Sequence, residues 1–250
     1  VNMGKSPISE KYVKKDNLEN IIPKVSLNLY FCKKCSHVQL LDVVNPDFLW
    51  ADFTFKTSRD IKLIKHFQDY VDRVFKVKKI DKKDFIIDIG SNDGTLLSFF
   101  KKHGLNVLGV DPAKEIAKKA SSNGIKTLPK FMNLTLSKDI RKNFGLADIV
   151  TANNAFAHGD DLIGLLKSIK NIMKPNGIFV FEVSYLLDVI EKILLGTIFH
   201  EHHSYHSLKP LIKFMSFFNM EIINVERVSI QGGSLIGTAQ IIGGPHKISP

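Results

Sequence analysis

The sequence predicts an α/β protein built on a doubly wound, mostly parallel sheet, and three features lead to this prediction. Apolar strands and amphipathic helices alternate from residue 81 to about residue 228. The first strand, 85–89, runs into a glycine-rich turn that opens a helix. The last strands, 221–228 and 235–242, are joined by a glycine loop without a helix. Strand–helix alternation produces right-handed crossovers between parallel strands, and the final hairpin adds an antiparallel pair.

Composition and charge narrow the class of protein. Of the 250 residues, 44% are hydrophobic, which suffices for a core. The most apolar stretch, Tyr185–Phe199, contains three charged residues, so we expect no membrane span. The polar first thirty residues lack a signal-peptide pattern, and two cysteines are too few for a disulfide framework. These features favour a cytoplasmic protein.

The net charge of +10 does not by itself indicate a nucleic-acid partner. The lysines are spread along the chain as pairs rather than gathered into one run. Such pairs are typical of solvated helix faces and loops. A phosphate-bearing small-molecule substrate would also be attracted to this surface, so the charge alone does not identify the partner.

Residues 1–48 are expected to form a partial zinc-binding module. Cys32 and Cys35 make a C-x-x-C flanked by short strands, as in the knuckle of a zinc ribbon. A structural zinc ion needs four ligands, and His37 is poorly spaced to be a third. A redox C-x-x-C would open a helix, whereas a strand follows here. From the residues alone, half a zinc site and two unliganded thiols remain equally open.

Residues 49–80 are expected to form a helical linker or substrate lid, with apolar residues at helical spacing. These residues are Ile61, Ile64, Phe67, Val71 and Val74. Residues 81–245 then form the sheet domain, and 246–250 would begin a further region. The expected strands are 85–89, 106–111, 147–152, 178–183, 221–228 and 235–242, the helices are 95–103, 114–121 and 160–173, and 174–177 is a turn.

The turn after the first strand predicts which cofactor binds. A dinucleotide-binding turn reads G-x-G-x-x-G and holds a pyrophosphate, but here Asp88 precedes Gly90. A carboxylate repels phosphate and suits the ammonium group of an amino-acid-bearing cofactor. Asp111 ends the second strand, where acids accept hydrogen bonds from ribose hydroxyls. The candidate cofactor-binding residues are Asp88, Gly90, Ser91, Asn92, Gly94, Asp111, Pro112 and Asn153.

This turn resembles the D-x-G-x-G-x-G signature of class I S-adenosylmethionine-dependent methyltransferases. The turn at 174–177 and the final strand pair also match that Rossmann-like fold. The resemblance implies S-adenosylmethionine as the cofactor. A nicotinamide-binding or other nucleotide-binding sheet is the alternative.

The chain more specifically resembles the C-methyltransferases that act on nucleotide-linked keto-deoxysugars. Six ordered stretches carry this resemblance: 32–40, 53–58 with His66, 88–94, 153–158, 199–207 and 231–235. The family has an N-terminal zinc module, which implies zinc at Cys32 and Cys35 if the missing ligand pair is supplied. Its signature Y-H-E-H-x-S-Y-x-S matches Phe199–Ser207.

The resemblance implies catalytic roles for three residues. His202 would be the base that forms an enolate, Glu201 its companion, and His158 a second polar group near the substrate. A histidine of near-neutral pKa suits this task. Without the resemblance, 199–207 could be a surface loop holding four of the nine histidines. A metal-binding H-E-x-x-H is excluded because Ser204 occupies its last position.

Three departures from the family pattern qualify the resemblance. Phe53, Phe55 and Phe199 replace tyrosines and cannot donate a hydrogen bond to an enolate. The first zinc-ligand pair and the family's C-terminal domain have no counterpart, so we expect a fragment truncated at both ends.

The sequence therefore predicts methylation of a carbon in a nucleotide-linked keto sugar. The alternatives are O- or N-methylation of another small molecule, or a non-catalytic cofactor-binding or zinc-ribbon adaptor.

Overall fold

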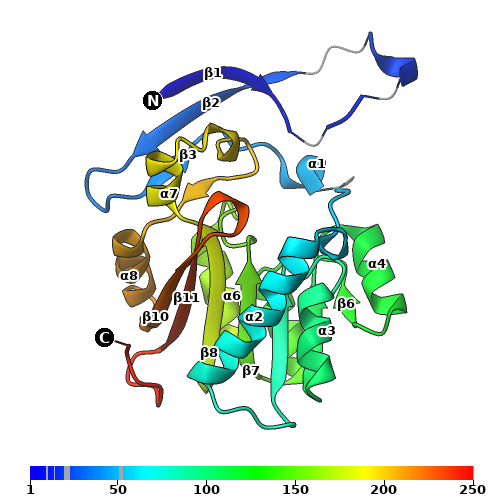
Figure 1. Cartoon of the computed structure of the whole chain (residues 1–250), viewed down its shortest axis with the longest axis vertical. Coiled ribbons are helices and arrows are strands. Elements are labelled where there is room, and N and C mark those ends of the chain that lie inside the picture. Colours follow the sequence, from blue (N-terminus) through cyan, green and yellow to red (C-terminus); the bar gives the residue numbers. More distant parts are fainter. Residues whose placement is uncertain (10, 14, 20–22, 51–52, 250) are drawn as a thin grey trace.

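The computed structural model describes residues 1–9, 11–13, 15–19, 23–50 and 53–249, which form two sheets (Figure 1). The larger sheet has the strand order β10-β11-β8-β7-β4-β5-β6. Its strands are β4 (Phe85–Ile89), β5 (Asn106–Val110), β6 (Thr127–Leu128), β7 (Ala147–Asn153), β8 (Met173–Ser184), β10 (Met220–Val228) and β11 (Ser234–Ile241). Strands β4 to β8 are parallel, and β10 and β11 are antiparallel. The predicted fold class is confirmed.

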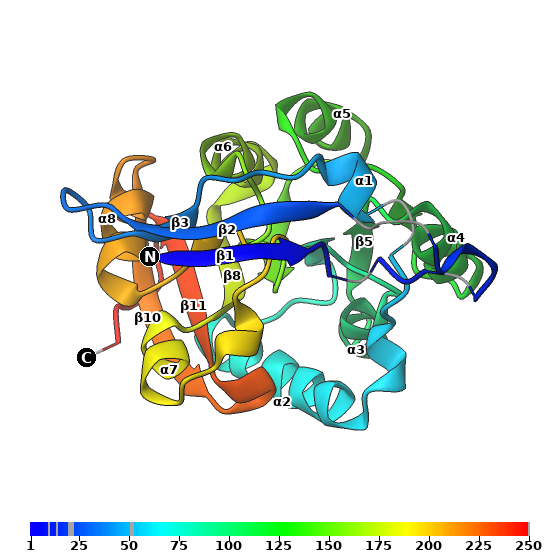
Figure 2. The same cartoon turned by 90° about the horizontal axis from the view of Figure 1, so that it is seen from above.

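Helices cover both faces of this sheet (Figure 2). On one face lie α5 (Leu134–Phe144), α6 (Leu162–Ile172) and α8 (Leu208–Ser216), and on the other α2 (Ile61–Val77) and α3 (Thr95–Lys102). The further helices are α4 (Lys114–Ser122), α1 (Pro46–Trp50) and α7 (Leu186–Glu191), with short 3-10 turns at Lys15–Asn17, Thr57–Arg59, Leu195–Thr197 and Ile230–Gly232. None of the helices described here is long and apolar enough to span a bilayer.

The apolar strand residues alternate between two cores, as a period of two requires. In β4, Ile86 packs with the core beneath α2 and α3, whereas Ile87 and Ile89 pack with the core beneath α5 and α6. All three side chains are buried. This double burial fixes the register of β4 and holds the turn that follows it at the carboxyl edge of the sheet.

Helix α2 confirms most of the predicted apolar face, with one exception. Phe67, Val71 and Val74 are buried, Ile64 is half-buried, and Ile61, in the first turn of the helix, is 83% exposed. Asp60 caps this turn by accepting hydrogen bonds from the backbone amides of Lys62 and Leu63. His66 and Tyr70 also belong to the buried face.

Several segments of the sheet domain differ from the prediction, and β6, α7 and α8 are further elements that the sequence did not predict. Strand β8 begins at Met173, which pairs with Ala147, so the turn expected over 174–177 is part of an extended strand. Helix α5 was not predicted from the sequence. Its apolar residues are few, but Asn133 caps it, and Leu136 and Ile140 are buried.

The smaller sheet joins the N-terminal region to the segment 199–207, which we call the histidine segment. It contains β1 (Asn2–Pro7), β2 (Lys24–Phe31), β3 (Val38–Leu40) and β9 (Ser204–Tyr205) in that order. Strand β9 pairs antiparallel with β3, and the amide of Leu40 donates to the carbonyl of His203. His200, Glu201 and His203 are buried. The surface-loop interpretation of the histidine segment is therefore wrong.

Candidate active site

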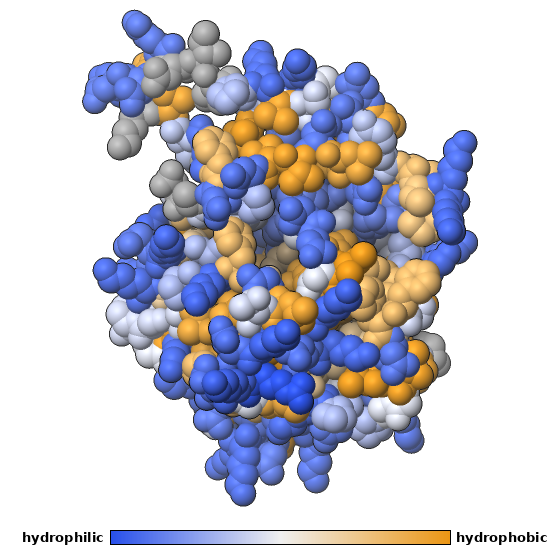
Figure 3. All heavy atoms as spheres, turned by 180° about the vertical axis from the view of Figure 1, so that it is seen from behind, coloured by the Kyte–Doolittle hydropathy of each residue, from blue (hydrophilic) through white to orange (hydrophobic). Residues whose placement is uncertain are grey.

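A cavity of about 1190 Å³ lies between the two sheets, at the carboxyl ends of β4, β5 and β7. Seen from behind, the surface is hollowed where the upper and lower layers meet (Figure 3). Seven of the eight predicted cofactor residues line the cavity, and Gly94 lines a separate groove on the far side of the turn. Ligand sites typically measure about 300–1,000 Å³, so the cavity has room for a cofactor and a second molecule.

The glycine turn brings the backbone close to its neighbours. Gly90 has φ +75°, and a Cβ atom there would lie 2.6 Å from Cβ of Ala155. Asn92 has φ +49°, which asparagine tolerates. The backbone amide of Asn92 donates a 2.8 Å hydrogen bond to Oδ2 of Asp111, and this bond links the ends of β4 and β5. A side chain at Gly90 would therefore collide with Ala155, another residue that lines the cavity.

Asp88 and Asp111 supply two buried carboxylates. Oδ1 of Asp88 accepts a 2.6 Å hydrogen bond from the hydroxyl of Thr151. Burial raises the pKa of Asp88 to about 7, a value that the Thr151 bond lowers and the Asp111 charge raises. Burial also raises the pKa of Asp111, whose oxygens accept from the amides of Asn92 and Ala113. Each carboxylate oxygen can accept a further hydrogen bond from a ligand.

The aromatic segment before α2 is tied to the cofactor turn. The side chain of Asn92 donates to the carbonyl of Phe55 and accepts from the amide of Thr57, each over 3.0 Å. Phe53 and Phe55 line the cavity. The segment therefore forms one wall of the site.

His202 and His158 lie together on the wall opposite the turn. Nδ1 of His202 donates to the carbonyl of Thr197 over 2.8 Å, and Nδ1 of His158 donates to the carbonyl of Glu201 over 2.7 Å. The ring centroids are 4.9 Å apart. Burial lowers the pKa of His202 to about 4 and, with the neighbouring His202, that of His158 to about 3. Both rings are therefore neutral at pH 7, and each keeps Nε2 as an acceptor.

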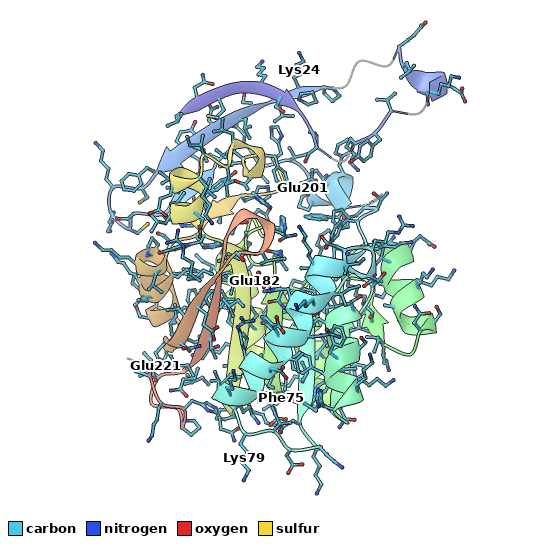
Figure 4. All side chains as sticks on the ribbon, viewed as in Figure 1. Lys24, Phe75, Lys79, Glu182, Glu201 and Glu221 are labelled. Carbon is cyan, nitrogen blue, oxygen red and sulfur yellow. The ribbon has the colours of Figure 1, made fainter. Side chains whose placement is uncertain are left out.

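The near-neutral pKa expected for His202 differs from this value, because the sequence does not reveal that the surrounding residues remove water from its half-buried ring. Its tautomer is held by a backbone carbonyl. The carboxylate of Glu201 accepts a hydrogen bond from Ser9, and in Figure 4 this residue lies between the upper sheet and the α/β layer. Phe199 packs on the ring of His202, with 4.1 Å between centroids.

Sequence reasoning missed Thr151, Trp50 and Glu182 near the site, and it named His66 only as part of the family resemblance. Thr151 holds Asp88, and Trp50 packs edge-on against His158 with ring centroids 5.1 Å apart. His66 pairs with Glu182 over 2.6 Å beneath the cavity, where both side chains are buried (Figure 4 labels Glu182). An acid inside the apolar run 178–183 was the available signal for Glu182.

The cysteine pair has the geometry of a zinc knuckle. Hydrogen bonds from the backbone amide and side chain of Cys35, and from the amide of Lys34, lower the pKa of Cys32. Ser36, where the family has glycine, adopts φ +64°. A structural zinc ion needs four ligands, of which this pair could supply two. In the part of the chain that the structure describes, no three His, Cys, Asp or Glu residues gather as a metal site, so a complete zinc site does not fit these residues.

The site does fit S-adenosylmethionine. The Gly90 cradle admits a ligand against bare backbone, Asp88 offers a carboxylate for an ammonium group, and Asp111 offers acceptors for ribose hydroxyls. Pro112 and Asn153 complete this half of the cavity. Together, the fold and the site define a class I, S-adenosylmethionine-dependent methyltransferase domain.

Comparison with known proteins agrees with this class. Residues 60–225 match the family model described as "Methyltransferase domain", and because this is more than half of the chain, the protein belongs to that family. Residues 1–50 match the model described as "Putative zinc binding domain".

Curated relatives include both C- and O-methyltransferases. The C-methyltransferase NovU of Streptomyces niveus is 28% identical over the whole of this chain, which spans 60% of NovU. The ubiquinone biosynthesis O-methyltransferase of Vibrio parahaemolyticus is 28% identical over 139 residues, which are 50% of this chain and 57% of that enzyme.

Solved structures share the fold. An S-adenosylmethionine-dependent methyltransferase from Clostridium acetobutylicum superposes with a TM-score of 0.57 at 14% identity, covering 73% of this chain and 92% of that one. The magnesium protoporphyrin IX methyltransferase of Synechocystis PCC 6803, solved with bound S-adenosylhomocysteine, superposes with a TM-score of 0.53 at 17% identity. The superposition covers 76% of this chain and 90% of that one.

Proposed function

We propose that this protein methylates a carbon atom next to the ketone of a nucleotide-linked sugar. The observation that carries the proposal is a neutral histidine, His202, with Nε2 available as a base in the same cavity as the cofactor turn. The similarity to NovU, described as a C-methyltransferase, supports carbon as the acceptor.

The chain's residues would divide the work between the two halves of the cavity. Asp88 and Asp111 hold S-adenosylmethionine, which supplies an electrophilic methyl group on a positively charged sulfur. His202 is the base, and His158 adds a second neutral acceptor beside it. Residues 49–80 act as a lid whose aromatic side chains exclude water, and residues 1–48, a partial zinc module, hold the histidine segment through β3.

The reaction begins when Nε2 of His202 takes the proton from the carbon beside the ketone. The C–H electron pair forms a C=C bond, and the carbonyl π electrons move to oxygen, giving an enolate. Asp88 and Asp111 would hold the S-adenosylmethionine that supplies the methyl group to the enolate carbon, and the electron pair of the carbon–sulfur bond would stay on sulfur. The protonated His202 returns its proton to solvent.

The test is the position of the new methyl group. The protein is incubated with methyl-¹³C S-adenosylmethionine and a ¹³C-labelled nucleoside-diphosphate keto-deoxyhexose. We expect one-bond carbon–carbon coupling between the methyl group and a ring carbon. A methyl group that lacks this coupling and is attached to oxygen would contradict the proposal.

O-methylation of another small molecule is the second candidate. Phe53, Phe55 and Phe199 give the cavity an apolar wall without hydroxyl donors for an enolate, and O-methyltransferases are among the relatives. The same labelled product distinguishes the two reactions.

A further inference from the structure

The side chains of Asn154 and Gln231 meet at the cavity wall although 77 residues separate them. Nδ2 of Asn154 donates a 2.9 Å hydrogen bond to Oε1 of Gln231. Asn154 follows β7, and Gln231 lies in the loop between β10 and β11. Both residues line the cavity.

Both residues have left-handed backbones. Asn154 has φ +52° and Gln231 has φ +50°. Asparagine adopts this conformation readily, but in glutamine it is uncommon and costs free energy. Strained residues of this kind gather at functional sites. At Gln231 the strained backbone carries a side chain that accepts a hydrogen bond from Asn154 at the cavity wall.

Contacts outside the pair keep these backbones in place. The backbone amide of Asn154 donates a hydrogen bond to the backbone carbonyl of Glu182 over 2.9 Å. Ser234, at the end of the Gln231 loop, pairs with Ser184, so the loop lies at the carboxyl edge of the sheet, beside the site. The backbones that carry the two side-chain amides are therefore held in place by neighbouring strands of the sheet.

The charged groups around this loop pair with one another. Arg227 donates to Asp188 over 2.9 Å, and Lys192 also pairs with Asp188. Nζ of Lys192 additionally donates to the carbonyl of Gly232 over 2.8 Å. The uncharged amides thus remain as the groups that this loop presents to a ligand.

The contact between the two amides uses one donor and one acceptor. Whichever way the amide oxygen and nitrogen atoms are assigned, one NH₂ group of the pair stays outside the contact. With the amide oxygen and nitrogen atoms as the structure assigns them, this is Nε2 of Gln231, for which the described residues provide no hydrogen-bond partner. Gln231 is exposed at the cavity wall and can donate to a ligand.

We propose that the Asn154–Gln231 pair donates a hydrogen bond to the carbonyl oxygen of the acceptor, on which negative charge develops as His202 removes the proton. The inference rests on the proposed function and names the donor that its enolate requires. Phe53, Phe55 and Phe199 cannot supply one. A preorganised amide is a suitable donor to a developing oxyanion.

Two variants of Gln231 test this role with the full chain, using a nucleoside-diphosphate keto-deoxyhexose in D₂O as the probe. Gln231→Met keeps the length of the side chain but removes the donor. We expect deuterium exchange and methylation to slow by roughly 10- to 100-fold. This is less than the roughly 10²- to 10³-fold fall in kcat that is typical when one oxyanion-hole donor is removed. Calorimetry should give an unchanged affinity for S-adenosylmethionine.

Gln231→Glu separates hydrogen-bond donation from shape. At pH 8 its carboxylate cannot donate, so exchange is at least as slow as in Gln231→Met. Towards pH 5 the carboxyl group gains a proton and can donate, so the rate rises in this variant alone. Wild-type rates in Gln231→Met, or parallel pH profiles of the two variants, would overturn the inference while leaving the proposed function standing. If the wild-type protein neither exchanges nor methylates the probe, the proposed function fails and the inference falls with it.

Discussion

Nδ1 of His202 donates a 2.8 Å hydrogen bond to the backbone carbonyl of Thr197. A carbonyl can only accept, so the proton of the neutral ring is on Nδ1 and the lone pair is on Nε2. The tautomer of His202 is therefore set by the backbone of the short turn Leu195–Thr197. Substitution of Thr197 itself would leave this contact intact.

The pH profile follows from the burial of His202. Because burial lowers its pKa to about 4, the base is neutral over most of the working range. We expect kcat/KM for the keto sugar, which reports groups of the free enzyme, to rise through about pH 4 and to show no inflection from this residue near pH 6.5. A histidine-dependent inflection at 6–7, lost in His202→Gln, would show that the ring is solvated.

Phe199→Tyr should restore a hydroxyl beside the base. The Phe199 ring lies 4.1 Å from that of His202, between centroids. We expect exchange at the carbon beside the ketone to accelerate by about 10-fold, less than the 10²–10³ of a preorganised donor, because the Asn154–Gln231 pair already donates. Phe217→Tyr, at an exposed position, is the control. An unchanged rate in Phe199→Tyr would mean that the enolate oxygen lies elsewhere.

Asp88→Asn should weaken cofactor binding while stabilising the free protein at high pH. Burial raises the folded pKa of Asp88 to about 7, above the unfolded value, so the stability it contributes is present at low pH and is lost as pH rises through 7. The thermal midpoint of the variant should exceed that of wild type at pH 8 by about 2–4 °C per kcal/mol relieved, and this difference should shrink as pH falls from about 7 towards the unfolded pKa of about 4.

Cofactor affinity should change in the opposite direction. Ionised Asp88 attracts an ammonium group, so wild-type affinity for S-adenosylmethionine should increase from pH 6 to pH 8, whereas the Asn variant should bind weakly and independently of pH. Calorimetry measures both. Equal affinities in the two proteins at pH 8 would remove Asp88 from the cofactor site.

Gly90→Ala tests the close approach at the turn. The new Cβ would lie 2.6 Å from Ala155 on a backbone with φ +75°, so we expect at least a 10-fold loss of cofactor affinity. Gly145→Ala is a matched control, because Gly145 has φ +89° but nothing within 4 Å of the added atom. Similar cofactor affinities in the two variants would show that strain alone, rather than the crowded turn, matters.

The sequence predicted the sheet well because its signals are local. The run from Phe85 to Gly94 alone contains a strand, an acid and the glycines of a turn, and the structure places each as expected. Helix α5 was missed because most of its residues are polar and its cap at Asn133 is a single residue. Local patterns identify elements but not the contacts between distant ones.

The histidine segment illustrates the second limit. Its residues were identified, but their surroundings depend on pairing between β3 and β9, which are more than 160 residues apart. That pairing buries the segment and lowers the pKa of His202. Neither effect can be predicted from the residues that neighbour the segment in the sequence. The contacts of Asn154 with Gln231 and of His66 with Glu182 are distant in the same way.

Deuterium exchange tests the central claim most directly. In D₂O, with a nucleoside-diphosphate keto-deoxyhexose and S-adenosylhomocysteine in place of the methyl donor, the wild-type protein should incorporate deuterium at the carbon beside the ketone. His202→Ala should abolish this exchange while keeping its affinity for S-adenosylhomocysteine. Exchange and methylation at wild-type rates in His202→Ala would contradict the account.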